Sequence, residues 1–211
     1  MGKGVEVMKI VVLGGFLGAG KTTVLMQFAA YLVRTDTSGK ETPVVILENE
    51  ISSAGVDNQL LSKANFTVEN IFDGCVCCSS SGLLCNNVRD IKKQYDPEWL
   101  ILEATGMAYP DNIRESLKED AGMDASILAL ADAKRWSRTL RAMAPFVKSQ
   151  LKDAAVILLN KVDLVKEEDV PAIKKEIEGF NSTATIYPII AIDPIEDRFW
   201  EEIIEILKKE C

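Results

Sequence analysis

Short apolar runs alternate with segments of helical periodicity along most of the chain. The apolar runs occur at 9–14, 43–48, 66–72, 98–104, 126–132, 154–160 and 185–191. Their length is that of strands, and apolar character that continues from residue to residue is typical of strands covered on both faces. The pattern therefore predicts a sheet of parallel strands.

The segments between these runs favour helices. Residues 21–34 place five apolar side chains on one face of a helix, namely Val24, Leu25, Phe28, Tyr31 and Leu32. Further helical stretches are predicted at 134–144, 166–179 and 196–209. Parallel strands joined by right-handed helical crossovers bury both faces of their sheet. We therefore expect a three-layer α/β fold, with a mostly parallel central sheet flanked by helices, and a single domain over residues 1–211.

Composition and charge narrow the choice of partners. The 211 residues suffice for a hydrophobic core, and 47% hydrophobic and 27% charged residues are ordinary for a globular protein. A net charge of −8, without a long run of Lys and Arg, argues against nucleic acid or an anionic membrane as partner. No secretory pattern and no stretch of membrane-spanning length is found, so we expect a cytoplasmic protein.

The strongest motif is "GGFLGAGKTT" at 14–23, between the first strand and the first helix. It fits G-x-x-x-x-G-K-[ST], in which glycines let backbone N–H groups approach phosphate oxygens at a helix N-terminus. We expect Lys21 at the β- and γ-phosphates and the Thr22 hydroxyl on Mg²⁺. The expected nucleotide contacts of this loop are Gly15, Gly18, Ala19, Gly20, Lys21, Thr22 and Thr23. A glycine-rich turn without a ligand is the alternative, which the complete motif in this context disfavours.

A second motif, "NKVD" at 160–163, indicates the base. Asp163 can accept hydrogen bonds from N1–H and the exocyclic amine of guanine, and adenine offers neither donor there. We expect Asn160 near N7 and the Lys161 stem over the ring. Alone, the tetrapeptide would also fit a helix cap and a solvated lysine. With the phosphate loop, it indicates GTP.

The acidic residue Glu103 ends the apolar run in "LILEATG" at 100–106. That is where the carboxylate supporting Mg²⁺ belongs, and Gly106 can bring its N–H to the γ-phosphate. A solvent-facing acid at a strand end is the alternative for Glu103. We expect hydrolysis of GTP to GDP and phosphate, with Lys21, Thr22 and Glu103 as the catalytic groups. Histidine is absent and no glutamine is evidently placed, so the general base is unassigned and intrinsic hydrolysis is expected to be slow.

The five cysteines are clustered rather than spread as a disulfide framework. Cys75, Cys77 and Cys78 fall within four positions, before a helix expected near the serines that follow. Thiols at a helix N-terminus tend toward thiolate, which selects ions such as Zn²⁺. Without histidine, the remaining ligands must come from oxygen or sulfur, such as Glu50, Cys85, water or a second subunit. A redox centre and a packed corner are the alternatives.

The motifs GGFLGAGKTT, ENE at 48–50, GCVCC at 74–78, LEATGMAYP, ALADA at 129–133 and NKVD occur in one order. This order resembles the CobW-type family of P-loop GTPases, allied to the GTPases that mature urease and hydrogenase, over about residues 9–192. The resemblance implies GTP and GDP with Mg²⁺, and Zn²⁺, Co²⁺ or Ni²⁺ at the C-x-C-C loop. It also implies a metallochaperone or a factor for metal or cobalamin cofactor maturation. A client metalloprotein or corrinoid protein is the implied partner, and a homodimer is suggested.

The sequence departs from that family in several places. "NEISS" at 49–53 keeps Glu50 but has Ser53 where the family usually has a second acid, and the His-rich tract of many members is missing. We expect the nucleotide-binding domain alone, without the usual C-terminal domain. Ile190-Ala191 stands where the family usually has Ser-Ala, and Ala191 is the expected base contact. Two other functions stay open: a GTP-dependent activator of a corrinoid or methyltransferase protein with incidental metal binding, and a thiol redox switch.

Overall fold

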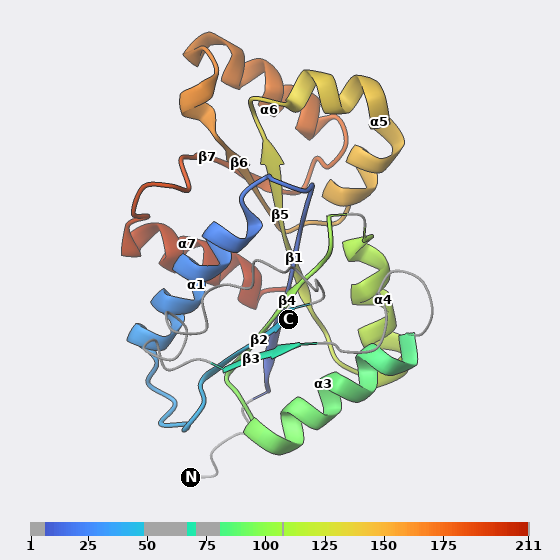
Figure 1. The fold of residues 1–211 in the computed structure, drawn as a ribbon, viewed down its shortest axis with the longest axis vertical. Helices are drawn as coiled ribbons and strands as arrows, with labels where there is room; N and C mark the ends of the chain where they lie inside the picture. Colours follow the sequence, from blue (N-terminus) through green and yellow to red (C-terminus); the bar gives the residue numbers. More distant parts are fainter. Residues whose placement is uncertain (1–6, 49–66, 71–80, 107, 211) are drawn as a thin grey trace.

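A computed structural model describes residues 7–48, 67–70, 81–106 and 108–210. The described strands form one parallel sheet in the order β3-β2-β4-β1-β5-β6-β7 (Figure 1). Their bounds are β1 Lys9–Gly15, β2 Val44–Glu48, β3 Thr67–Asn70, β4 Trp99–Glu103, β5 Ser126–Asp132, β6 Val156–Asn160 and β7 Thr185–Ile189. Each corresponds to one predicted apolar run, so the predicted parallel sheet is confirmed.

Helices cover both faces of this sheet. The described helices are α1 Lys21–Thr35, α3 Ser81–Tyr95, α4 Pro110–Ala121, α5 Trp136–Leu151, α6 Val170–Glu178 and α7 Asp197–Lys208. Helices α1 and α7 cover one face, and α3, α4, α5 and α6 cover the other (Figure 1). The buried side chains of the two groups belong to two separate cores. The predicted three-layer α/β fold is therefore confirmed.

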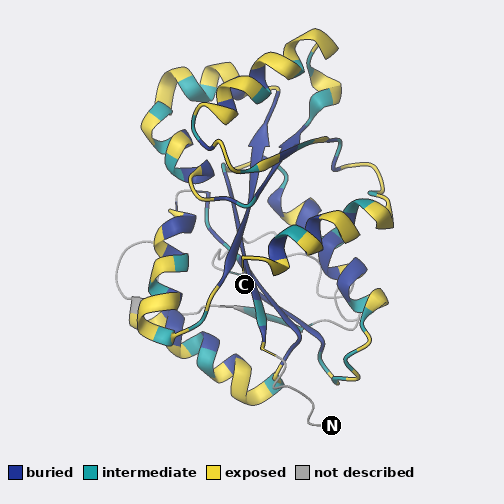
Figure 2. Cartoon of the chain, turned by 180° about the vertical axis from the view of Figure 1, so that it is seen from behind, coloured by how far each residue is buried: buried dark blue, intermediate teal, exposed yellow. Residues whose placement is uncertain are grey.

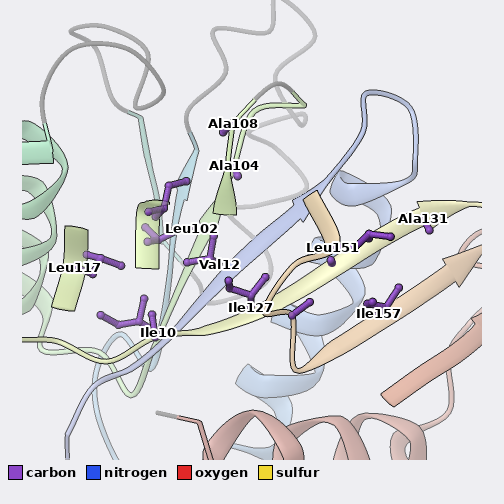
Figure 3. Close-up of a cluster of buried hydrophobic side chains, with 14 of the residues drawn as sticks. Ile10, Val12, Leu102, Ala104, Ala108, Leu117, Ile127, Ala131, Leu151 and Ile157 are labelled. Carbon is purple, nitrogen blue, oxygen red and sulfur yellow. The ribbon is translucent and has the colours of Figure 1, made fainter. Parts of the chain in front are cut away.

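The two cores explain why the strands read as continuous apolar runs. Successive side chains of a strand point to opposite faces. Ile10 and Val12 belong to the core under α3 to α6, which is drawn in Figure 3, whereas Val11 and Leu13 belong to the core under α1 and α7. All four are fully or almost fully buried, so these four consecutive positions of the central strand must be apolar. Figure 2 shows the same contrast between a buried sheet and helices with exposed outer faces.

Helix α5 corrects one prediction. The helix expected at 134–144 begins at Trp136 and continues through Pro145 to Leu151. Proline lacks an N–H and its ring clashes with the preceding turn, so a kink or a stop is expected there. The chain adopts the kink: Met143 has non-helical angles, with φ −143° and ψ 40°, and the helix resumes after it. The resumed half carries Phe146 and Gln150.

Smaller differences occur at other element ends. The segment predicted as a helix at 166–179 begins with a 3₁₀ turn, Glu167–Asp169, before α6, and the last strand ends at Ile189 rather than at 191. The helix expected near the serines is α3, which begins at Ser81. Among the described residues, the structure has no helix that combines the length and apolar character needed to span a bilayer.

Candidate functional site

The carboxyl ends of the parallel strands meet at one edge of the sheet, and a cavity of about 530 Å³ lies there. Ligand sites of open parallel sheets are found at this edge. The strand register places Leu13 beside Glu103 and Asp132 beside Asn160. Ten of the predicted site residues line the cavity: Gly18, Gly20, Lys21, Thr22, Thr23, Glu103, Asn160, Lys161, Asp163 and Ala191. Gly15, Ala19 and Gly106 are not among its lining residues.

The loop after β1 wraps around the start of α1. Gly20, just before the helix, has φ +104°, a conformation that residues with a Cβ rarely adopt. A Cβ there would also lie 2.4 Å from Asn160 Nδ2. The Lys21 side chain is buried, with only 6% of the residue exposed, and its Nζ donates to Gly15 O at 3.1 Å. The loop therefore folds around its own lysine, as an anion-binding loop requires.

The two predicted Mg²⁺ groups lie together. Thr22, in the first turn of α1, donates its hydroxyl to Glu103 Oε1 at 3.4 Å. Glu103 reaches this position because it is the last residue of β4, which pairs with β1. A hydroxyl and a carboxylate are hard oxygen donors of the kind Mg²⁺ prefers, so the pair fits this ion.

Asn160, which lines the cavity, connects three loops. Its Nδ2 donates to Ala19 O at 2.8 Å, and its Oδ1 accepts from Lys161 N at 2.8 Å and Ala191 N at 2.9 Å. Ala191, the expected base contact, thus donates its backbone N–H to Asn160. The Asn160 amide nitrogen carries two hydrogens, so its bond to Ala19 leaves one donor for N7.

Lys161 and Asp163 also line the cavity. The Lys161 ammonium donates to Gly18 O of the phosphate loop and to Asp132 Oδ2, the latter at 2.7 Å. Its stem thus crosses the cavity from β6 toward the loop after β1. Asp163 is exposed, on the 3₁₀ turn Val162–Leu164 that follows, and it lines the cavity. Both residues predicted to contact the base therefore line the cavity, with Lys161 bridging two loops and Asp163 exposed.

Several residues at or beside the site lie outside the motifs read from the sequence. Asp132 is only 8% exposed, holds Lys161, and accepts a hydrogen bond from Arg135 N at 3.1 Å. It ends β5 as Glu103 ends β4, so the strand-end rule used for Glu103 would have found it. Lys134 and Arg135 add two cations to the cavity wall. Gln27 and Gln150, which hydrogen-bond to the backbone of loops around the cavity, belong to no sequence motif.

The predicted transition-metal ligands Glu50, Cys75, Cys77 and Cys78 lie outside the described residues. In the part of the chain that is described, no cluster of three or more cysteine, aspartate, glutamate or histidine side chains is placed to hold a metal. Cys85, the further candidate, is buried in α3 and donates its thiol to Ser116 O at 3.5 Å. Burial, followed by the Asp120 carboxylate, raises the pKa of this thiol above its ordinary value, which disfavours the thiolate.

The model of the CobW/HypB/UreG nucleotide-binding domain matches residues 9–188, most of the chain. The chain belongs to this family. The match includes the phosphate loop, Glu103 and the Asn160–Asp163 segment, so the motifs and the geometry converge on one assignment. The curated relatives support it.

Two relatives show how this CobW/HypB/UreG domain compares with longer proteins. It is 29% identical to the zinc chaperone YjiA of Escherichia coli, over 85% of this chain and 57% of that protein. It is 26% identical to the zinc-regulated GTPase metalloprotein activator 1 of Dictyostelium discoideum, over 87% of this chain and 46% of that protein. The chain thus spans about half the length of these relatives.

Solved structures share the fold. The hydrogenase maturation factor HypB from Archaeoglobus fulgidus superposes with a TM-score of 0.69 and 16% identity, over 94% of this chain and 89% of that one. HypB from Helicobacter pylori, in a complex with nickel, gives a TM-score of 0.65 and 16% identity, over 97% and 89% of the two chains. At this identity, the superpositions show that the CobW/HypB/UreG domain has the HypB fold.

Proposed function

We propose that the chain binds GTP, hydrolyses it to GDP and phosphate, and couples this reaction to metal binding at its C-x-C-C loop. It would then act as a metallochaperone or a factor for metal or cobalamin cofactor maturation, with a client metalloprotein or corrinoid protein as partner. The observation that carries the nucleotide part is that Lys21, the Thr22–Glu103 pair and Asp163 line one cavity.

Different residues are assigned to the base, the phosphates and Mg²⁺. The Asp163 carboxylate selects guanine by accepting hydrogen bonds from the N1–H and the exocyclic amine of the base, and Lys161 lies beside the ring. The backbone of residues 15–20 and the Lys21 ammonium hold the phosphates and offset the negative charge on the γ-phosphoryl group. Thr22 and Glu103 would hold Mg²⁺, which when bound neutralises charge on the β- and γ-phosphates. With no general base identified, a partner that completes the site is expected.

The metal part of the proposal rests on the sequence and the relatives. Two of these are named as a zinc chaperone and a zinc-regulated activator, and one structural neighbour contains nickel. We assign Zn²⁺, or Co²⁺ or Ni²⁺, to Cys75, Cys77 and Cys78 with Glu50, because thiolates select borderline ions. The ion is cargo or signal here rather than a catalyst. The assignment of residues 1–211 to one domain, a homodimer and a cytoplasmic location stay predictions.

Base selectivity tests the nucleotide assignment. The native protein should bind GTP far more tightly than ATP, because adenine leaves the Asp163 carboxylate unpaired. Asp163→Asn should shift the preference toward xanthosine triphosphate, whose 2-oxo group accepts a hydrogen bond from the new amide. Competition titrations with a fluorescent GTP analogue measure both effects. Asp169→Asn, a carboxylate outside the cavity, is the matched control. Equal affinity of the native protein for GTP and ATP rules out the guanine assignment.

Metal titration tests the coupling. Reduced protein should bind about one Zn²⁺ or Co²⁺ per subunit or per dimer, with sulfur-to-metal charge-transfer absorption in the Co²⁺ form. The double substitution Cys77→Ser with Cys78→Ser should abolish that absorption, and Cys211→Ser should leave it. Metal affinity should differ between GDP and a GTP analogue by about 1–3 kcal/mol, because coupling between two sites is reciprocal. Fully reduced protein that binds no metal would favour the corrinoid-activator or redox-switch alternatives.

A further inference from the structure

The second half of α5 contacts two loops of the site at once. The Phe146 ring packs edge-on against Phe16 of the phosphate loop, with ring centroids 5.1 Å apart and planes at 89°. The same ring packs edge-on against Tyr109, at the end of the loop after β4, at 5.4 Å and 85°. Edge-to-face pairs of this kind are specific in geometry. One helix residue therefore holds an aromatic side chain of each loop.

Gln150 repeats the arrangement one helical turn later, on the same face of α5. Only 1% of it is exposed. Its Oε1 accepts from the Gly15 N–H at 2.9 Å, and its Nε2 donates to Ala108 O. A primary amide can accept from one backbone and donate to another, so this side chain bridges two segments that lie 42 and 135 residues away in sequence.

The two bridged loops also touch each other directly. Ala104 N donates to Leu13 O at 3.0 Å where the loop after β4 begins. A Cβ on Gly106 would lie 2.7 Å from Leu17 N, so the two backbones pass in close contact. The spacing between the phosphate loop and the loop after β4 is thus set by backbone contact on one side and by α5 on the other.

We propose that Gln150, supported by Phe146, is a positioning residue that sets this spacing for a γ-phosphate. The inference rests on the proposed function. The phosphate loop contacts the phosphates of both GDP and GTP, whereas the loop containing Gly106 is expected to meet only the γ-phosphate. Loss of the bridge therefore lowers the affinity for a ligand that contacts both loops, such as GTP. It leaves the affinity for a ligand that contacts only the phosphate loop, such as GDP, nearly unchanged. A purely structural role for Gln150 would lower stability and affect GDP and GTP alike.

The test uses the full chain with two substitutions and a neighbour as control. Gln150→Met keeps the length of the side chain and removes both hydrogen bonds. Gln150→Glu, when ionised, keeps acceptors for Gly15 N–H and loses the donor to Ala108 O. Ser149→Ala, which removes only a local bond of the hydroxyl to Phe146 O at 2.8 Å, is the control. If Gln150→Met does not fold, Gln150→Asn carries the same prediction, because its shorter side chain cannot bridge both loops.

Affinities for GDP and a non-hydrolysable GTP analogue are measured for each variant, with thermal melting and the kcat and KM of hydrolysis. Gln150→Met and Gln150→Glu should lower affinity for the GTP analogue by about tenfold, the effect of one buried hydrogen bond, and affinity for GDP by less than about threefold. Ser149→Ala should match the native protein. The inference is overturned if a Gln150 variant loses affinity for GDP and for the GTP analogue equally, or if the ratio of the two affinities is the same as in the native protein. Native protein that binds neither nucleotide overturns the proposed function instead.

Discussion

At the residue scale, three amide side chains organise the loops around the cavity. Asn160 joins Ala19 to Ala191, and Gln150 joins Gly15 to Ala108. Gln27 of α1 closes the loop after β7 by donating to the carbonyls of residues 191 and 193 and accepting from the N–H of residue 195. An amide supplies a donor and an acceptor without a net charge. It can therefore fix backbone near bound phosphates without altering the electrostatics of the site.

Lys21 and Glu103, proposed to act on the phosphates and on Mg²⁺, give the sharpest prediction at this scale. Lys21→Ala and Glu103→Gln should each lower Mg²⁺-dependent phosphate release from GTP by about a hundredfold or more, since we propose that Lys21 directly, and Glu103 through Mg²⁺, offset the charge that develops in the transition state. Thermal melting without nucleotide should stay close to native for Lys21→Ala, because this substitution removes a buried ammonium. Lys118→Ala, an exposed lysine of α4 paired with Asp124, is the control. Native turnover in both site variants would refute their assigned roles.

At the scale of single elements, the end of α4 isolates the effect of backbone conformation. Gly122 follows the helix with φ +65°, and its N–H donates to carbonyls in the last turn. Nothing lies within 4 Å of a Cβ built there. Gly122→Ala should therefore lower the free energy of unfolding by about 1 kcal/mol through left-handed strain alone, as measured by urea denaturation.

The matched control for this substitution, Gly82→Ala, is expected to change the free energy of unfolding in the opposite direction. Gly82 lies within α3, and a Cβ there would likewise meet nothing within 4 Å. Gly82→Ala should raise the free energy of unfolding by about 0.5–1 kcal/mol, because alanine loses less backbone entropy in a helix. If both substitutions changed stability in the same direction, backbone conformation would not explain the effect at Gly122.

Helix α5 shows where the sequence pattern mispredicts the end of a helix. The pattern ended a helix before Pro145, because proline normally breaks one. The structure carries α5 on to Leu151, because Val147 and Leu151 are buried in the core on that face of the sheet. This burial outweighs the local cost of proline. As a result, the extension carries Phe146 and Gln150, the residues that bridge the two loops.

At the scale of the whole molecule, the burial of tyrosine and cysteine side chains predicts that the free energy of unfolding falls at alkaline pH. Burial raises the pKa of Tyr31, Tyr187 and Cys85 above their ordinary values, with Glu201 adding to the effect at Tyr31 and Glu202 at Tyr187. A group whose folded pKa exceeds its unfolded pKa stabilises the fold below the unfolded value and loses that contribution as pH rises through the folded value. The free energy of unfolding should therefore fall as pH rises past the ordinary pKa of cysteine and then of tyrosine.

Urea denaturation at neutral and alkaline pH checks this expectation. Tyr31→Phe should reduce the alkaline decline, because it removes one of the groups that the unfolded chain ionises more readily. An unfolding free energy that stays constant from neutral into alkaline pH would contradict the prediction. A decline that is unchanged in Tyr31→Phe would show that Tyr31 does not contribute to it.

The sequence by itself determined the strands, the parallel α/β class, the phosphate loop and the Asn160–Asp163 motif. These features are contiguous: a strand, a glycine-rich turn or a four-residue motif carries its physical reason in neighbouring residues. The strand-end position of Glu103 was equally readable, because it needs only the end of an apolar run. The same rule applied to β5 would have found Asp132.

Only the tertiary structure decided which of these pieces meet. The strand order places β4 beside β1, and this brings Glu103 within 3.4 Å of a hydroxyl 81 residues away in sequence, that of Thr22. The pairing of Lys161 with Asp132 and the two bonds of Gln150 have the same origin. Such contacts depend on how helices cross the sheet and pack on it, a property of the whole core rather than of any local segment.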